Sequence, residues 1–176
     1  MFLRKLNAVL SLIATILVLV HAVSLAIWMI TKGAVKKMET ILPRVLMGVM
    51  ILHALISILL GVLGHKNAEK RKCNEYQQLN LVTMFQRIGG TIMIVFTAFH
   101  ILGAVGVMQP SKLLHIVLSP LFFTIVLAHV AISTSKAFIT LGIGSAKSIK
   151  IMDIIIKAFC LITLIISIIG FYLFSV

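Results

Sequence analysis

Six histidines are the residues of this chain with the clearest capacity for chemistry, because imidazole binds metal ions and haem iron at neutral pH. His65 lies in a basic segment, whereas the other five lie inside long apolar runs or at their edges. Four consecutive apolar runs carry one deep histidine each: His21, His53, His100 and His129. A hydrogen bond to a neighbouring helix explains a single histidine of this kind. Four of them, one per run, indicate a common ligand, because an unsatisfied polar group in hydrocarbon is costly.

The elements that carry these histidines are predicted to be membrane helices. Of the 176 residues, 61% are hydrophobic and 11% are charged, and the mean hydropathy is +1.18. A soluble domain of this size cannot bury so much apolar surface, whereas a bilayer accommodates it at about 20 residues per span. We therefore predict an all-α fold in one domain, residues 1–176, forming an integral membrane bundle of five transmembrane helices. The expected spans are 8–30, 45–64, 88–107, 113–133 and 151–174.

The charges predict how this bundle is oriented. The net charge is +12, and the basic residues sit in short segments between apolar runs, which favours membrane topology and anionic lipid over nucleic acid. Along alternating spans, eleven of the 16 Lys and Arg residues fall on the side of the N-terminus. The positive-inside rule then predicts a cytoplasmic N-terminus, an uncleaved first helix and an external C-terminus. None of the four acidic residues lies near the bilayer centre, which disfavours an ion-coupled transporter.

The depth of the four histidines sorts them into two pairs. With a helical rise of about 1.5 Å per residue, His21 and His100 lie roughly 20 Å from the inner face, and His53 and His129 roughly 10–18 Å from it. Each pair joins two helices that run in the same direction. Two bis-histidine b-type haems stacked across the membrane would need this arrangement, His21 with His100 and His53 with His129. The sequence has no CxxCH motif, so such haems would be bound non-covalently.

Several short motifs around the histidines belong to one joint pattern. In chain order they are His53-Ala54, Gln86-x3-Gly90-x9-His100, Gln109-Pro110 and His129-x6-Lys136-x5-Gly142. The pattern, which covers nearly the whole chain, resembles the cytochrome b membrane-anchor subunit of succinate:quinone and quinol:fumarate oxidoreductases, in its single-subunit, five-helix, di-haem type. Two features depart from that family: the histidines are somewhat closer together, and Lys136 replaces an arginine. No acidic residue adjoins His129, so a proton path through the helices is not expected.

The resemblance implies electron transfer by a subunit that performs no bond chemistry of its own. Electrons would pass between membrane quinone, menaquinone or ubiquinone, and an iron–sulfur subunit and flavoprotein subunit on the cytoplasmic face. The complex would be of the succinate dehydrogenase or fumarate reductase type, would reside in a prokaryotic cytoplasmic membrane and could dimerise. The four paired histidines would be the axial ligands of two haem b irons. Lys136 would meet a haem propionate as a point charge, and Gly90 would allow close approach of the macrocycle.

Two further residues are candidates for the quinone site. Glu39 follows His21 by 18 residues on the outer side and could exchange protons with quinol. His115 lies at the mouth of its span, just after Lys112, and is interpreted as a surface or quinone-pocket residue rather than as an iron ligand.

Two alternative functions stay open at this point. Another small b-type cytochrome could anchor a different flavoprotein or reductase, although such proteins place their histidine pairs on fewer helices. A non-redox small transporter or an assembly factor would use the histidines for packing or metal binding.

Overall fold

The chain folds entirely into helices in the computed structural model, which describes residues 2–31, 41–71, 81–104, 106–107 and 112–175. The helices are α1 (Phe2–Ile30), α2 (Ile41–Arg71), α3 (Leu81–Ala104), α4 (Lys112–Leu141) and α5 (Ala146–Ser175). No strand occurs within these ranges, and the predicted all-α fold with five helices is therefore confirmed.

Four of these helices are long and apolar enough to cross a membrane. By length and composition they are α1, the Ile41–Leu63 part of α2, the Ile116–Leu141 part of α4, and the Ala146–Leu173 part of α5. The chain thus has the helices of a multi-pass membrane protein. The fifth span, expected within α3, stays a prediction.

Glycines end α3 and α4. Gly106 (φ 78°) and Gly142 (φ 71°) adopt left-handed conformations that other residues rarely accept. After α4, the amide of Gly142 donates to the Ile139 carbonyl (3.1 Å), and the amide of Ile143 donates to the Phe138 carbonyl (3.1 Å). This pair of bonds is the Schellman cap, which satisfies the last carbonyls of a helix. It accounts for the end of α4 at Leu141, which lies eight residues past the expected end of its span at residue 133.

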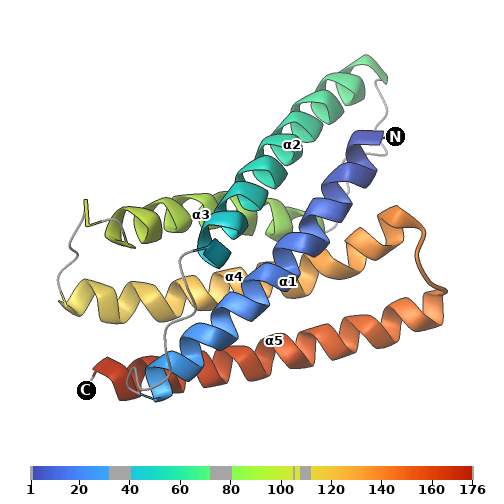
Figure 1. Ribbon diagram of the computed structural model, residues 1–176. Helices are drawn as coiled ribbons and strands as arrows, with labels where there is room; N and C mark the ends of the chain where they lie inside the picture. Colours follow the sequence, from blue (N-terminus) through green and yellow to red (C-terminus); the bar gives the residue numbers. More distant parts are fainter. Residues whose placement is uncertain (1, 32–40, 72–80, 105, 108–111, 176) are drawn as a thin grey trace.

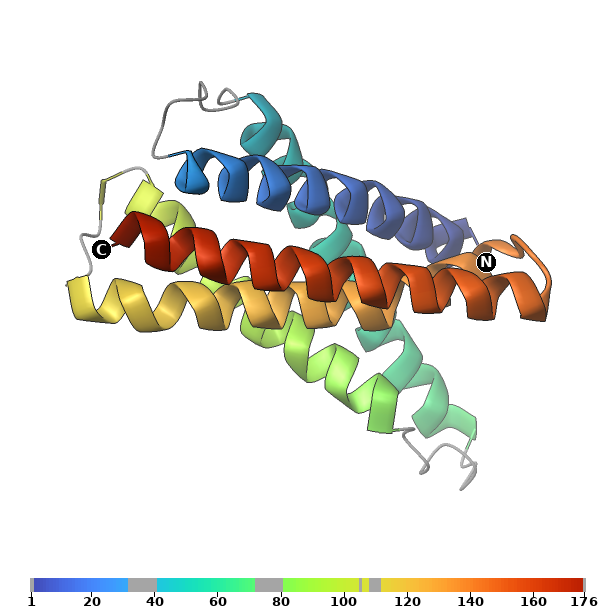
Figure 2. The same ribbon diagram turned by 90° about the horizontal axis from the view of Figure 1, so that it is seen from below.

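Consecutive helices run in opposite directions. Figure 1 shows the N-terminus and the turn between α4 and α5 toward one end of the bundle, and the C-terminus, the end of α3 and the start of α4 toward the other. We call the first of these the N-terminal end. Helices α1, α4 and α5 pack on one another, while α2 packs on α1 and α3 packs on α4. In the described part of the chain, neither the pair α2 and α4 nor the pair α1 and α3 forms an extensive interface. The steep crossing of α2 and α3 relative to α4 and α5 is visible in Figure 2.

The tight core lies between α1, α4 and α5. Leu127, Val130 and Cys160 form its buried apolar cluster. The hydroxyls of Thr15 on α1 and Thr134 on α4 lie 3.5 Å apart within the buried interior. Small and hydroxyl residues of this kind allow membrane helices to approach closely.

Much apolar surface stays outside this core. The accessible surface of the chain is 11,944 Å², whereas a soluble monomer of this mass would expose about 8,500 Å². Large apolar side chains such as Ile16, Leu55 and Ile162 are more than half exposed. Lipid hydrocarbon is the natural solvent for such a surface.

Candidate functional site

The interface between α3 and α4 brings together three of the residues singled out by the sequence. The two helices are antiparallel, and Lys136 Nζ of α4 donates a 2.7 Å hydrogen bond to Gln86 Oε1 of α3. Further along, the Phe122 ring of α4 lies 5.3 Å from the His100 ring and 6.2 Å from the Phe96 ring, measured between centroids. The motif residues Gln86, Gly90 and His100 therefore lie along the part of α3 that packs against α4.

Two glycines of α3 make room for the imidazole of His129. A Cβ atom at Gly90 would lie 3.3 Å from His129 Cε1 and 3.8 Å from its Nδ1, and one at Gly89 would lie 3.8 Å from Nδ1. The ring consequently rests directly on the backbone of α3. Sequence reasoning assigned Gly90 to contact with a macrocycle, and the structure adds a role that it missed, which is to seat a histidine of the neighbouring helix.

His129 and His53 lie in the same part of the bundle. Their side chains are close enough for charges on the two rings to interact, although their helices α4 and α2 share no extensive interface among the described residues. In each ring the Nδ1 atom is buried and has no hydrogen-bond partner within the part of the chain that the structure describes. His53 and His129 are thus two imidazoles in one part of the bundle, and their pairing at one iron stays a prediction.

Hydrogen bonds from neighbouring residues support the helix segments that carry both histidines. The His53 ring hydrogen-bonds the backbone of Asn7, and Ser57, one turn later on α2, donates to Asn7 Oδ1 at 3.1 Å. On α4 the Ser133 hydroxyl donates to the His129 carbonyl oxygen. These bonds leave the two Nδ1 atoms unsatisfied, and a third buried orphan is the hydroxyl of Thr97. Thr97 lies seven residues after Gly90 and therefore on the same face of α3.

Helix α1, which carries His21, and helix α3, which carries His100, form no extensive interface among the described residues. His21 is half-buried on α1, and His100 is exposed on α3 beside Phe122. Because Phe122 precedes His129 by seven residues, His100 lies about 10 Å farther along α4 than His129, away from the N-terminal end. The order of these two histidines along the bundle agrees with an outer and an inner position. The pairing of His21 with His100 stays a prediction.

The two candidate quinone residues differ in whether the structure describes them. Glu39 lies outside the described residues, and His115 lies in the first turn of α4. Groups of three or more metal-binding side chains do not occur in the ranges that the structure describes, but a bis-histidine iron needs only two protein ligands.

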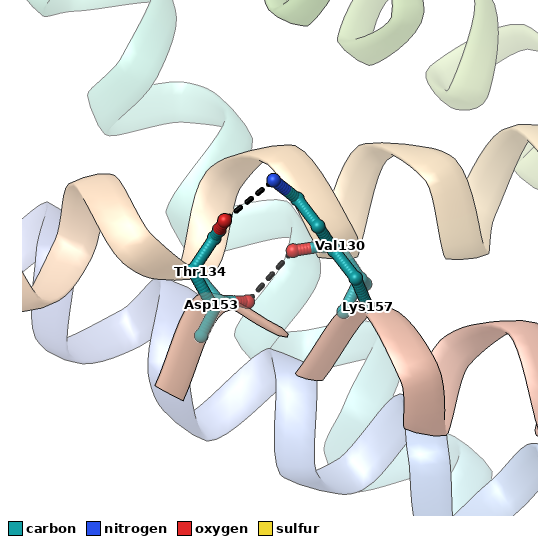
Figure 3. Close-up of polar contacts among 4 residues, drawn as sticks. All are labelled: Val130, Thr134, Asp153 and Lys157. Carbon is teal, nitrogen blue, oxygen red and sulfur yellow. Dashed lines mark hydrogen bonds and ion pairs between the residues drawn. The ribbon is translucent and has the colours of Figure 1, made fainter. Parts of the chain in front are cut away.

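Sequence reasoning missed a second polar site, between α4 and α5. A pocket of about 440 Å³ is lined there by Ser135 and Lys136 of α4 and by Lys150, Asp153 and Lys157 of α5. Lys157 Nζ and the Asp153 carboxylate form an ion pair at 2.5 Å (Figure 3). The spacing of these two residues by four positions was the available signal, because such pairs meet on one face of a helix.

Comparison of the chain with models of protein families, with curated proteins and with solved structures found no match.

Proposed function

We propose that this chain is a haem b membrane anchor that carries electrons between membrane quinone and soluble iron–sulfur and flavoprotein subunits of the succinate dehydrogenase or fumarate reductase type. The observation that supports this function most is the pair His53 and His129. They are two neighbouring imidazoles, each with a buried ring nitrogen that lacks a partner, on helices that are not packed together in the described part of the chain.

The imidazoles of His53 and His129 could hold the iron of a b-type haem. They stand on α2 and α4, which form no extensive interface among the described residues and so would leave room for such a group. A buried, unpaired nitrogen is costly in an apolar medium unless a ligand satisfies it. A haem held there would supply one-electron transfer, which no side chain of this chain supplies.

Other residues would hold the rest of such a group. Lys136 follows His129 by seven residues, so it lies on the same face of α4 about 10 Å closer to the N-terminal end. Its ammonium is fixed by Gln86 and could also pair with a propionate. By analogy, His21 and His100 would bind a second haem on the outer side, and Glu39 and His115 are the candidates for contact with quinone.

The visible spectrum of the purified chain tests this function. We expect the absorbance of a b-type haem, with bands that sharpen when the haem is reduced. Adding a quinone analogue should reoxidise the haem and restore the oxidised spectrum. His53→Ala and His129→Ala should each remove about half of the haem per chain, because each deletes one of two ligands of one site. His65→Ala is the matched control, since His65 lies outside the ligand set, and it should keep the full haem content.

Three results would count against the proposal. A colourless wild-type protein that is helical and monodisperse, even after haem is added during expression, would refute haem binding altogether. Full haem content in both His53→Ala and His129→Ala would show that these two residues are not the ligands. Haem that is bound but is never reoxidised by quinone would favour another small b-type cytochrome.

A further inference from the structure

The pocket between α4 and α5 carries an excess of positive charge. Its lysines are Lys136, Lys150 and Lys157, and its only acidic lining residue is Asp153. Asp153 is occupied by Lys157 at 2.5 Å and lies within hydrogen-bonding reach of Ser135. The lining residues thus carry three positive charges and one negative charge, a net charge of +2.

The two remaining lysines differ in how they are held. Lys136 donates a hydrogen bond to the neutral side-chain oxygen of Gln86, which positions its ammonium at the wall of the pocket. Lys150 is exposed, and among the described residues it has no hydrogen bond or ion pair. An anion that enters the pocket would thus meet one fixed ammonium and one adjustable ammonium.

Apolar side chains lie on the same faces of α4 and α5 as the polar residues that line the pocket. On α5, Ile154 lies four residues after Lys150 and three before Lys157, so the three share one face. On α4, Ile139 lies four residues after Ser135. Ile154 is 59% exposed and Ile139 is 62% exposed. A small water-soluble anion would leave this apolar surface uncovered, whereas a molecule with a negatively charged head and hydrocarbon tails would cover it.

The position of the pocket in the bundle agrees with such a ligand. Its lining residues belong to the last part of α4 and the first part of α5, and Figure 1 shows the turn between these two helices at the N-terminal end of the bundle. The charge distribution predicts that this end faces the cytoplasm, and basic pockets between membrane helices on that side are typical sites for anionic lipid head groups.

We propose that this pocket binds the phosphate of an anionic phospholipid. Lys150 and Lys157 contact the phosphate, Lys136 adds positive charge from the wall, and the acyl chains cover Ile154 and its neighbours on α5. Asp153 orients Lys157 and limits the net charge of the pocket. This site shares Lys136 with the proposed haem site but includes neither histidine of the pair, and lipid binding by Lys150 and Lys157 does not depend on haem.

The test titrates the purified full chain in neutral detergent with phosphatidylglycerol, phosphatidylcholine or inorganic phosphate and records the thermal unfolding temperature. Phosphatidylglycerol should raise this temperature in a saturable manner, and the other two should not. Lys150→Gln and Lys157→Gln should each raise the half-saturating concentration about fivefold, as expected for one lysine at an anionic surface. Lys147→Gln is the matched control, because Lys147 is exposed near the start of α5 but does not line the pocket.

Each other outcome overturns the proposal. An equal shift with inorganic phosphate would show an anion site with no requirement for lipid, and an equal shift with phosphatidylcholine would show general solvation by lipid. A response that Lys147→Gln weakens as much as Lys150→Gln does would indicate diffuse attraction to the basic surface rather than a site. Circular dichroism of each variant checks that helicity is unchanged, so that a weaker response to lipid can be distinguished from unfolding of the variant.

Discussion

Substituting Gly90 tests whether the His129 ring is seated on α3 as the structure shows. In Gly90→Ala the new Cβ would lie 3.3 Å from His129 Cε1, so the ring must move by a few tenths of an ångström. In Gly89→Ala the nearest ring atom is 3.8 Å away, which is an ordinary contact. Replacing a helical glycine with alanine favours the helix by about 1 kcal/mol at either position. Crowding at a packed site costs about 1–3 kcal/mol and applies to Gly90 alone.

The two substitutions are therefore expected to have different effects on the stability of the folded chain. Gly89→Ala should be more stable than the wild type by about 1 kcal/mol, and Gly90→Ala should be less stable than Gly89→Ala by about 1–3 kcal/mol. Thermal unfolding of both proteins in the same detergent measures this difference as several degrees. If haem is bound, Gly90→Ala should also alter its spectrum, while Gly89→Ala should not. Equal stabilisation by the two alanines would refute the seating of His129 on Gly90.

Three further predictions concern packing and charge. Gly170→Ala should destabilise the chain by about 1–3 kcal/mol, because the new Cβ would lie 3.2 Å from a backbone oxygen of α1. Gly61→Ala is the control and should not destabilise the chain, because its Cβ would meet no described atom within 4 Å. Thermal unfolding compares the two variants. Ser167→Ala should leave stability unchanged or raise it by up to about 1 kcal/mol, since the Ser167 hydroxyl is buried without a partner, and marked destabilisation would show that the hydroxyl is bonded. Asp153→Asn should change stability by less than about 1 kcal/mol because its ion pair is partly exposed. By freeing Lys157, it should tighten phosphatidylglycerol binding, and weaker binding would contradict the role given to Asp153.

The helices could be predicted from the sequence because long apolar runs leave few other folds open. Their ends could be predicted less well, because apolarity marks where a helix can enter lipid and not where its backbone stops. The expected span 113–133 thus lies inside a helix that continues to Leu141, where Gly142 provides the left-handed cap. The sequence contains that glycine, but its role depends on a positive φ angle, which among the described glycines only Gly106, Gly142 and Gly144 adopt.

The candidate site could be predicted only at the level of residue types. The joint motif singled out Gln86, Gly90 and Lys136, and the structure places them along the interface between α3 and α4. It could not show that Gly90 seats His129, since that contact depends on the register of α3 against α4. The pocket beside Asp153 was missed for the same reason, because α4 and α5 each contribute only part of it.

The unpaired nitrogens also bear on the choice between a ligand site and simple packing. In a membrane helix, short hydroxyl side chains satisfy themselves on the carbonyl four residues earlier, as Thr134 does with Val130 at 2.7 Å (Figure 3). Histidine is too rigid to do this, so a histidine that served only to pack would need a partner on another helix. His129 has glycine backbone on one side and His53 nearby, yet the buried Nδ1 of each ring stays unsatisfied. Packing alone thus retains the cost of two desolvated nitrogens, and a metal ion held by both imidazoles would reduce it.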